Sequence, residues 1–495
     1  MRSIALTAIA ATAVAAAAPA QSANPEALLR RAVAALGGEQ ALRGISSIAI
    51  EFNSASFALG QEETPLSPAR ATLSWGRITT DWRANRRVGI SELRLPTGAV
   101  VRQRQVIAGE IGMTEANGVQ TPTAPGAVAG ALQGMRLQPD RLLLRALDQP
   151  ASLSPVPPKR WRGELMDGVR FAQGADTVAL YFDRLSGLLT VSELVTDDPI
   201  LGDRHGITWY TKWQDAGAVK LPRQFDSYTN ERLLSHNDVT ALTLNGDVAD
   251  TLFAIPDSIA RRAQRASPAP PPVVVNLVEL APGVWRAEGG SHHSLVVEQT
   301  SQLVVVEAPQ NAARFRAVLD TLKSRYPARP VGLVVNTHHH WDHAGGVRSA
   351  LAAGLRLGTH QRNLAFIRGI AAARKTIQPD ALSRRQTLPS IVAVSDSLII
   401  GTGDRRVVLY ELPTSHVEGM LAAYVPSARL LFAADVLSPP VPPAAPTLPA
   451  LGSGELAALV RRLGIPVERY AGAHGGVVSW TEVERAAGPP LTRIP

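Results

Sequence analysis

The sequence predicts a two-domain α+β protein in which a mainly antiparallel β domain precedes an α/β domain. Residues 266–274 are Pro-rich, which is the composition of a semi-rigid linker. Before this segment, residues 24–265 contain many short stretches in which apolar and polar residues alternate, the pattern of antiparallel strands with one wet face. After it, residues 275–495 alternate short apolar strands with helices, the order of an α/β fold.

The start of the chain predicts export. Met1-Arg2-Ser3 precedes an apolar, Ala-rich stretch at 4–18, and small residues follow at 18–23. We interpret residues 1–23 as a cleaved signal peptide, with an uncleaved anchor as the alternative. The apolar run is short for a membrane-spanning helix, and no later segment reaches that length. We therefore expect a secreted or periplasmic mature chain without a transmembrane segment.

The amino-acid composition excludes several kinds of catalytic group and binding partner. The 495 residues include no Cys, which excludes disulfides, thiolate nucleophiles and Cys metal ligands. The formal charge is +8, but no run of like charge stands out, so we expect no nucleic-acid partner. We expect a small-molecule or lipid-like substrate, and the sequence sets no oligomeric state.

The N-terminal domain shows secondary structure but no catalytic constellation. Asn24 is expected to cap a helix that Gly37-Gly38 ends, and a second helix is expected within 127–147. The domain resembles, in shape more than in motif, the curved half-barrels of periplasmic lipoprotein carriers. Such a sheet could present an apolar groove to a lipid or substrate tail, or serve as a docking or oligomerisation module. Its clearest strand-like segments are 47–52, 71–75, 88–95, 177–182, 206–213 and 239–244.

A histidine-rich run in the C-terminal domain carries the chemistry. It is Asn-Thr-His-His-His-Trp-Asp-His-Ala-Gly-Gly at 336–346, directly after the apolar strand 332–335. Strand ends are where ligands bind in α/β folds. His338 and His340 are two residues apart, so both can face one ion from an extended loop, while Asp342 and His343 can face another. Imidazole and carboxylate ligands suit zinc, iron or manganese.

Three later residues follow strands that should end near the same edge. His416 comes after the strand 407–412, Asp435 ends the strand 430–434, and His474 follows 467–470. A carboxylate in this place could bridge two cations. A solvated His tract that binds metal by accident would explain the first cluster, but not three separate motifs in order after strands.

These motifs resemble the metallo-β-lactamase superfamily over nearly all of residues 275–495. The signature HxHxDH is met by His338, His340, Asp342 and His343. The resemblance implies an αββα sandwich that holds two divalent metal ions, zinc first and iron or manganese as alternatives. It also implies a ligand set: His338, His340 and His416 for one ion, Asp342, His343 and His474 for the other, and Asp435 as the bridge.

Four further side chains are candidates to support the ligands or touch substrate. Glu307 stands where the family usually has Asp, and it could accept a hydrogen bond or be a plain solvated acid. His339 should face away from the ions. His292 and His293 follow Gly289-Gly290 and could touch substrate or form a surface turn.

The resemblance implies hydrolysis of an ester, lactone or amide by a metal-bridging hydroxide, with Asp342 orienting the nucleophile as the catalytic residue. The absence of Cys excludes lactamases with a Cys ligand, and Asp435 favours glyoxalase-II-like, lactonase-like or esterase-like relatives. The alternatives are a phosphodiester or sulfate-ester hydrolase, an iron-dependent dioxygenase, and a non-catalytic envelope binding protein. The Pro-rich loop 438–449 could form a lid or a rigid surface excursion.

Overall fold

The computed structural model describes residues 24–174, 176–266, 272–440 and 451–488. The predicted signal peptide, residues 1–23, lies outside the described residues. So do most of the predicted linker, at 267–271, and most of the loop 438–449. Within the described ranges, no helix has the length and hydropathy that crossing a bilayer requires.

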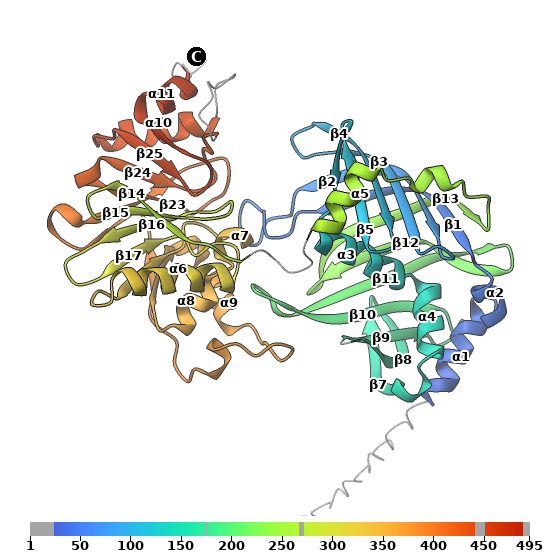
Figure 1. Cartoon of the computed structure of the whole chain (residues 1–495). Helices are drawn as coiled ribbons and strands as arrows, with labels where there is room; N and C mark the ends of the chain where they lie inside the picture. Colours follow the sequence, from blue (N-terminus) through green and yellow to red (C-terminus); the bar gives the residue numbers. More distant parts are fainter. Residues whose placement is uncertain (1–23, 175, 267–271, 441–450, 489–495) are drawn as a thin grey trace, which may run out of the picture.

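The N-terminal region is one curved, fully antiparallel sheet of 13 strands (Figure 1). Apart from the pair β1–β13, every strand pairs with its neighbour in sequence. The strands are longer than the predicted segments because the alternation weakens toward their ends while the backbone pairing continues. They are β1 (Ser47–Phe57), β2 (Ala71–Asp81), β3 (Arg86–Arg94), β4 (Val100–Ala108), β5 (Ile111–Ala116), β6 (Val119–Pro122), β7 (Ser154–Trp161), β8 (Glu164–Gln173), β9 (Asp176–Asp183), β10 (Leu189–Asp198), β11 (Gly202–Ala216), β12 (Val219–Thr229) and β13 (Arg232–Leu244).

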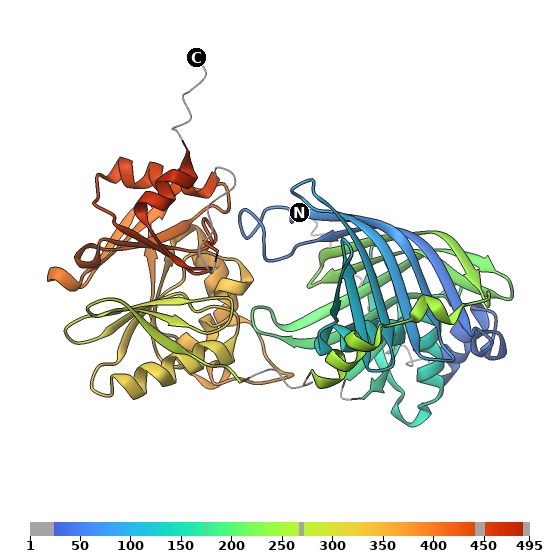
Figure 2. The same cartoon turned by 45° about the horizontal axis from the view of Figure 1, so that its top comes forward.

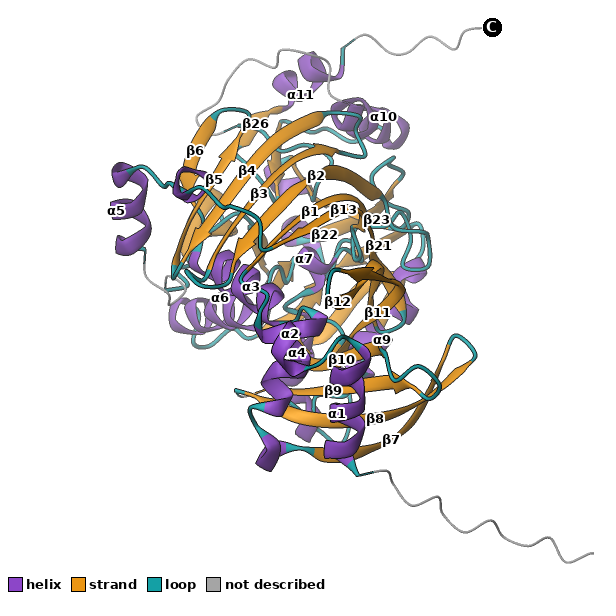
Figure 3. Cartoon of the chain, turned by 90° about the vertical axis from the view of Figure 1, so that its right-hand side faces the viewer, coloured by secondary structure: helices purple, strands orange, loops and turns teal. Residues whose placement is uncertain are grey.

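Helices pack on this sheet at two places. The helices α1 (Pro25–Ala35), α2 (Glu39–Arg43) and α4 (Pro139–Leu147) gather over one end of it, where Leu29 and Leu143 join Phe171 and Leu180 in one apolar core (Figure 3). The helix α5 (Asp257–Arg265) packs against β5 through Ile259.

Two helix predictions meet different outcomes. Asn24 caps α1 by accepting from the amide of Glu26, as expected. The single helix expected within 127–147 is wrong: the chain forms α3 (Pro125–Arg136) and then α4. The break falls at Gln138, which precedes Pro139, because a proline disfavours helical backbone in the residue before it and cannot continue a helix.

The C-terminal region contains two mixed sheets. The first joins β14 (Asn276–Ala281), β15 (Val284–Glu288), β16 (Ser294–Glu298), β17 (Leu303–Val306), β18 (Val331–Val335), β19 (Arg356–His360) and β20 (Ile391–Val394). The second joins β21 (Ser397–Ile400), β22 (Val407–Leu412), β23 (Met420–Val425), β24 (Leu430–Ala433), β25 (Arg469–Gly472) and β26 (Val477–Ser479). The helices are α6 (Ala312–Arg325), α7 (Trp341–Ala344), α8 (Val347–Ala352), α9 (Leu364–Ala372), α10 (Leu451–Leu463) and α11 (Trp480–Ala487).

Three apolar cores hold these elements in four layers, the predicted αββα order (Figure 1). Phe315 of α6 and Ile367 of α9 pack on the outer face of the first sheet. Val306 and Phe432 belong to the core between the sheets. Leu456 of α10 packs on the outer face of the second sheet. Strands that are buried on both faces explain the continuous apolar runs in the sequence.

Candidate metal centre

The predicted metal ligands lie where strands of both sheets end. His338 and His340 follow β18, and Asp342 and His343 lie in the adjoining helix α7. In the second sheet, β22 and β24 each pair antiparallel with β23, and β25 runs parallel to β24, so all three point the same way. Their carboxyl ends therefore share one edge, and His416, Asp435 and His474 follow them there.

One group of side chains comprises His338, His340, His416 and Asp435, whose candidate ligand atoms all lie within 4.8 Å of one another. The Nε2 atom of His416 lies 3.1 Å from Nδ1 of His340 and 3.1 Å from Oδ2 of Asp435. The Nε2 atom of His338 lies 3.4 Å from the same carboxylate oxygen. These atoms converge on one point from three separate loops.

A second group comprises Asp342, His343, His474 and His292. The Nε2 atoms of His343 and His474 are 3.3 Å apart. Both face Oδ1 of Asp435, at 3.0 and 2.9 Å. One oxygen of Asp435 thus faces the first group and the other oxygen faces the second, which is the arrangement of a bridging carboxylate.

Hydrogen bonds on the far side of three rings set which nitrogen is free. Nε2 of His340 contacts the carbonyl of Glu62 at 2.9 Å, and Nδ1 of His474 contacts the carbonyl of Ser291 at 2.8 Å. Because a carbonyl can only accept, each ring donates N–H there and turns its other nitrogen toward the group. His343 contacts Glu307 through Nδ1 at 2.5 Å and likewise presents Nε2.

The charge states match the needs of a cation. Burial, together with the nearby His343, holds the pKa of His338 well below its ordinary value, and burial lowers the pKa of His340 to about 4. Burial alone would raise the pKa of Asp435, but the surrounding imidazoles outweigh it and hold that pKa far below its usual range. Neutral imidazole and ionised carboxylate are the states that ligate metals.

His343 behaves differently from the other rings. Burial acts to lower its pKa, but Glu307 and Asp435 outweigh burial and raise the pKa of His343 to about 10. A cation that takes Nε2 must therefore displace a proton from this ring.

Glu307 is no solvated acid. Its side chain is completely buried, and it accepts from the amide of Thr337 at 3.1 Å and from His343. Its φ of 85° is unusual for a residue other than glycine. The carboxylate ties β17 to the histidine-rich loop and orients one ligand candidate, so the supporting role expected for this residue is the one that its contacts favour.

The interpretation of 291–294 as a surface turn is wrong, because His292 and His293 are buried. The ring of His292 lies against His474, and its Nε2 is 3.2 Å from Oδ2 of Asp342. The backbone amide of His293 donates to the carbonyl of Ala473 at 2.8 Å, which pulls the segment under the strand edge.

His339 belongs to neither group of candidate metal ligands. It is buried beside Phe366, and neither of its nitrogens has a hydrogen-bond partner among the described residues.

The residues present fit a pair of metal ions. His338 Nε2 and Asp435 Oδ1 are buried without a hydrogen-bond partner in the described part of the chain. A buried polar atom without a partner is costly, and one cation in each group would satisfy both atoms, His338 Nε2 in the first group and Asp435 Oδ1 in the second. The ligand set of imidazole and carboxylate without Cys is one that zinc, iron and manganese accept.

One contributor to the centre was not predicted. Residues 60–63, in the loop between β1 and β2 of the N-terminal sheet, contact His340, Trp341 and Asp342. Nothing in the sequence around Gly60 forms a motif, and the contact depends on how the two regions dock.

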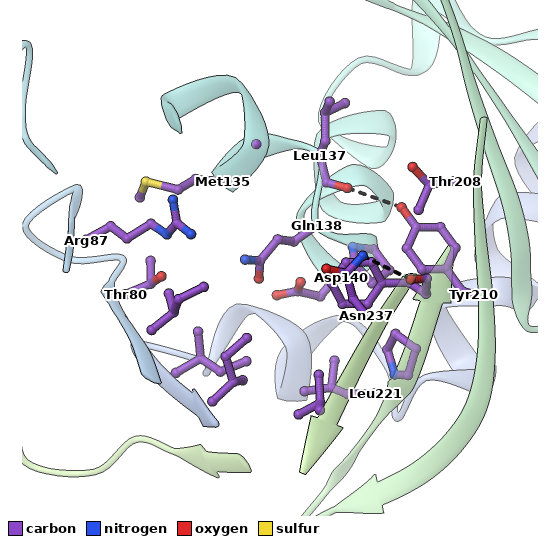
Figure 4. Close-up of a pocket in the computed structure, with 18 of the residues that line it drawn as sticks. Thr80, Arg87, Met135, Leu137, Gln138, Asp140, Thr208, Tyr210, Leu221 and Asn237 are labelled. Carbon is purple, nitrogen blue, oxygen red and sulfur yellow. Dashed lines mark hydrogen bonds between the residues drawn. The ribbon is translucent and has the colours of Figure 1, made fainter. Parts of the chain in front are cut away.

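A separate cavity of about 470 Å³ lies in the N-terminal region (Figure 4). Side chains of the curved sheet, such as Ile48, Leu221 and Phe225, form one wall, and residues 130–140 at the junction of α3 and α4 form another. Its polar groups include Arg87 and Thr80, and the buried hydroxyl of Thr80 has no hydrogen-bond partner among the described residues. This volume lies in the range of cavities that hold small ligands.

Comparisons with known proteins give a family match and several similar solved structures. Residues 287–474 match the model of the metallo-beta-lactamase superfamily. Among similar solved structures is a metallo-beta-lactamase from Pontibacter korlensis, which is 16% identical with a TM-score of 0.33 over 43% of this chain and 97% of that chain. The metallo-beta-lactamase FIM-1 from Pseudomonas aeruginosa, in its mono-zinc form, is 15% identical with a TM-score of 0.35 over 44% and 95%.

A metallo-beta-lactamase from Hirschia baltica is 17% identical with a TM-score of 0.33, over 43% of this chain and 96% of that one. The comparison with curated proteins gives no match. The match of the family model, together with the four layers and the histidine-rich edge, shows that the C-terminal domain of this chain belongs to the metallo-beta-lactamase superfamily.

Proposed function

We propose that this protein is an exported hydrolase that uses two divalent metal ions, most readily zinc. The observation that carries the proposal is the position of Asp435, whose two carboxylate oxygens face two separate groups of imidazole and carboxylate side chains. Without cations, this arrangement leaves two buried polar atoms, His338 Nε2 and Asp435 Oδ1, without a hydrogen-bond partner among the described residues, which is costly. Export rests on the predicted signal peptide at 1–23.

The candidate ligands divide into one set for each proposed ion. His338, His340 and His416 would hold one ion, and Asp342, His343 and His474 the other, with Asp435 shared. When bound, the ions would activate a water molecule at neutral pH and polarise the scissile group. Asp342 is the residue best placed to orient that water, because Gln61 and His292 hold its two oxygens in a defined direction. His292 belongs to the same group as Asp342, His343 and His474 and would supply an additional ligand there.

An ester, lactone or amide is the proposed substrate bond. The support is the complete His/Asp set with Asp435, which resembles that of glyoxalase-II-like and lactonase-like relatives. A phosphodiester or sulfate-ester hydrolase and an iron-dependent dioxygenase use similar ligands, and a binding protein without activity would need only the fold. The identity of the bound metal would distinguish an iron-dependent dioxygenase from the hydrolases. Turnover of a substrate would distinguish a binding protein from both kinds of enzyme.

The cavity in the N-terminal sheet favours a lipid-like ligand for the protein. Its walls are largely apolar. Arg87 lies at one side without an ion-pair partner in the described part of the chain, whereas the carboxylate of Asp140, which also lines the cavity, is paired with Arg141. An acidic amphiphile would satisfy both features, because its tail matches the apolar walls and its head group matches the guanidinium. Binding of a fluorescent fatty acid by the full chain, weakened in Arg87→Met, would support this; equal binding in both proteins would contradict it.

Elemental mass spectrometry of the purified protein tests the main proposal. We expect about two zinc ions per chain, as in binuclear sites of this kind. The double variant H338A/H340A should lose metal and esterase activity, whereas H205A, which removes an exposed histidine of the N-terminal sheet, should retain both. Metal-free protein after reconstitution would overturn the proposal, and one iron per chain would redirect it to oxygen-dependent chemistry.

A further inference from the structure

The loop at residues 58–70, between β1 and β2, extends from the N-terminal sheet toward the C-terminal domain (Figure 2). Four consecutive residues make the contact. The carbonyl of Gly60 accepts from the amide of Trp341 at 3.2 Å, and that of Glu62 accepts from Nε2 of His340. The side chain of Gln61 donates to Oδ1 of Asp342 at 2.8 Å, and the carbonyl of Glu63 accepts from Glu418 at 2.9 Å.

Two of these contacts bear on the metal ligands themselves. The carbonyl of Glu62 fixes the tautomer of His340, so that Nδ1 keeps its lone pair for an ion. The side-chain amide of Gln61 donates to Oδ1 of Asp342, while Oδ2 faces the second group, at 3.2 Å from Nε2 of His292 and 3.6 Å from Nε2 of His343. One ligand of each proposed ion is therefore oriented from the other domain.

The N-terminal domain holds this loop in a defined shape. The carboxylate of Glu62 is buried, accepts from the amide of Gly60 at 2.8 Å and pairs with Arg232 of β13. Gly60 has a φ of 84°, and a Cβ atom there would lie 2.2 Å from the ring of Trp341. Only glycine allows the backbone to approach that ring so closely.

A second contact fixes the two domains relative to each other. The turn between β10 and β11 enters the C-terminal domain, where Ile200 is buried in the core beneath the first sheet. The amide of Asp203 donates to the carbonyl of Arg374 at 2.7 Å, and its carboxylate accepts from Thr376. Because the domains contact each other at two separate places, they cannot rotate freely about either one. The loop 58–70 therefore keeps its position relative to the C-terminal domain.

We propose that Gln61 is a positioning residue of the metal centre and that the loop 58–70 is a structural part of that centre. The N-terminal domain would then raise the affinity for both ions by orienting His340 and Asp342. This inference rests on the proposed binding of two metal ions, but not on which bond the protein hydrolyses.

The test measures zinc affinity of the full chain by competition with a chromophoric chelator. We expect Q61A to lower the affinity for one of the two zinc ions by about 10- to 100-fold and to leave the affinity for the other unchanged. The loss of a hydrogen-bond partner of a metal ligand has effects of that size. Q61M keeps the length of the side chain without its donor, so it should show the same loss. The matched control is Q120A, which removes a Gln–Glu contact within the N-terminal sheet.

A third variant extends the test to both ions. In G60V the new side chain must push the loop away from Trp341, so both zinc ions should bind more weakly while circular dichroism stays unchanged. If Q61A and Q61M bind both ions as tightly as Q120A, the positioning role is wrong, whatever G60V does. If the unaltered chain binds no metal, the proposed function itself fails.

Discussion

The two regions of this molecule organise their residues in opposite ways. In the N-terminal sheet nearly every pairing joins strands that are consecutive in sequence, so the topology is simple, and none of its described residues belongs to either group of candidate metal ligands. In the C-terminal domain, helical crossovers return parallel strands to one edge, and residues as distant as His343 and His474 meet there. Chemistry concentrates where crossovers bring strand ends together.

The comparison also shows that a site can extend beyond the fold that carries its motif. The metal edge belongs to the C-terminal domain, yet Gln61 and Glu62 reach it from the N-terminal sheet. The N-terminal domain in turn holds a ligand-sized cavity that contains none of the predicted metal ligands.

The sharpest way to test this division is to remove the charge that the two groups share. D435N preserves the shape of the side chain, and Asn tolerates the φ of 57° at this position. We expect the loss of at least one zinc ion and a fall of hydrolysis to background, measured by elemental mass spectrometry and an ester assay. The urea unfolding of the N-terminal domain should not change, and retained activity would refute the bridging role of Asp435.

The next largest effect is expected from breaking the buried pair of Glu307 and His343, which lies at the same edge of the sheets. E307A removes the partner of His343, and breaking a buried pair in this way typically costs about 3–5 kcal/mol. Urea unfolding of the metal-free protein measures the loss. E307Q, which retains an acceptor of similar volume, should lose clearly less, and equal losses would show that packing rather than the pair matters.

These residues also show how far sequence reasoning reaches. The histidine-rich run, His416, Asp435 and His474 could be located because each follows an apolar strand. Strand β18 could be located from its apolar run alone. These predictions depend on short stretches of sequence, which form the same elements in the folded protein.

Other features depend on distant contacts and have no local signal. Glu307 could be an ordinary surface acid until β17 pairs with β18 and places it beneath the histidine-rich loop. His292 and His293 are buried in a segment that distant residues hold, since Ala473 accepts from the amide of His293 and Arg314 donates to the carbonyl of His292. The contact of Gln61 with Asp342 joins residues 281 positions apart in different domains, and no periodicity or spacing predicts it.

A core change in the N-terminal sheet tests whether the regions unfold separately. Leu180 is fully buried against α1 and α4, and L180A should lower stability by about 2–5 kcal/mol. We expect the loss in the unfolding step of the N-terminal domain, with the zinc content unchanged. If the zinc content falls as well, the two domains unfold as one unit, and the centre depends on the whole N-terminal fold rather than on the loop 58–70 alone.

The smallest expected effect concerns the docking contact away from the metal edge. The ammonium group of Lys375 lies 2.5 Å from Asp197 and 3.2 Å from the carbonyl of Asp198, and its side chain is buried. Hydrogen bonds to charged groups contribute about 1.5–3 kcal/mol, so K375A should lower the free energy of unfolding by that amount. The control K220A removes a Lys–Asp pair that is exposed, and it should change stability by only about 0–1 kcal/mol.

Zinc affinity in K375A then shows whether the loop 58–70 is held by its local anchor at Arg232 or by the whole domain interface. Ile200 still anchors the β10–β11 turn in this variant, and Arg232 still anchors Glu62, so we expect zinc affinity within about twofold of the unaltered chain, far from the effect of losing a direct ligand partner. A tenfold loss in K375A would mean that the loop reaches the ions only when the whole domain interface is intact. The position of Gln61 would then be set by docking between the domains, and the local anchor at Arg232 would be insufficient.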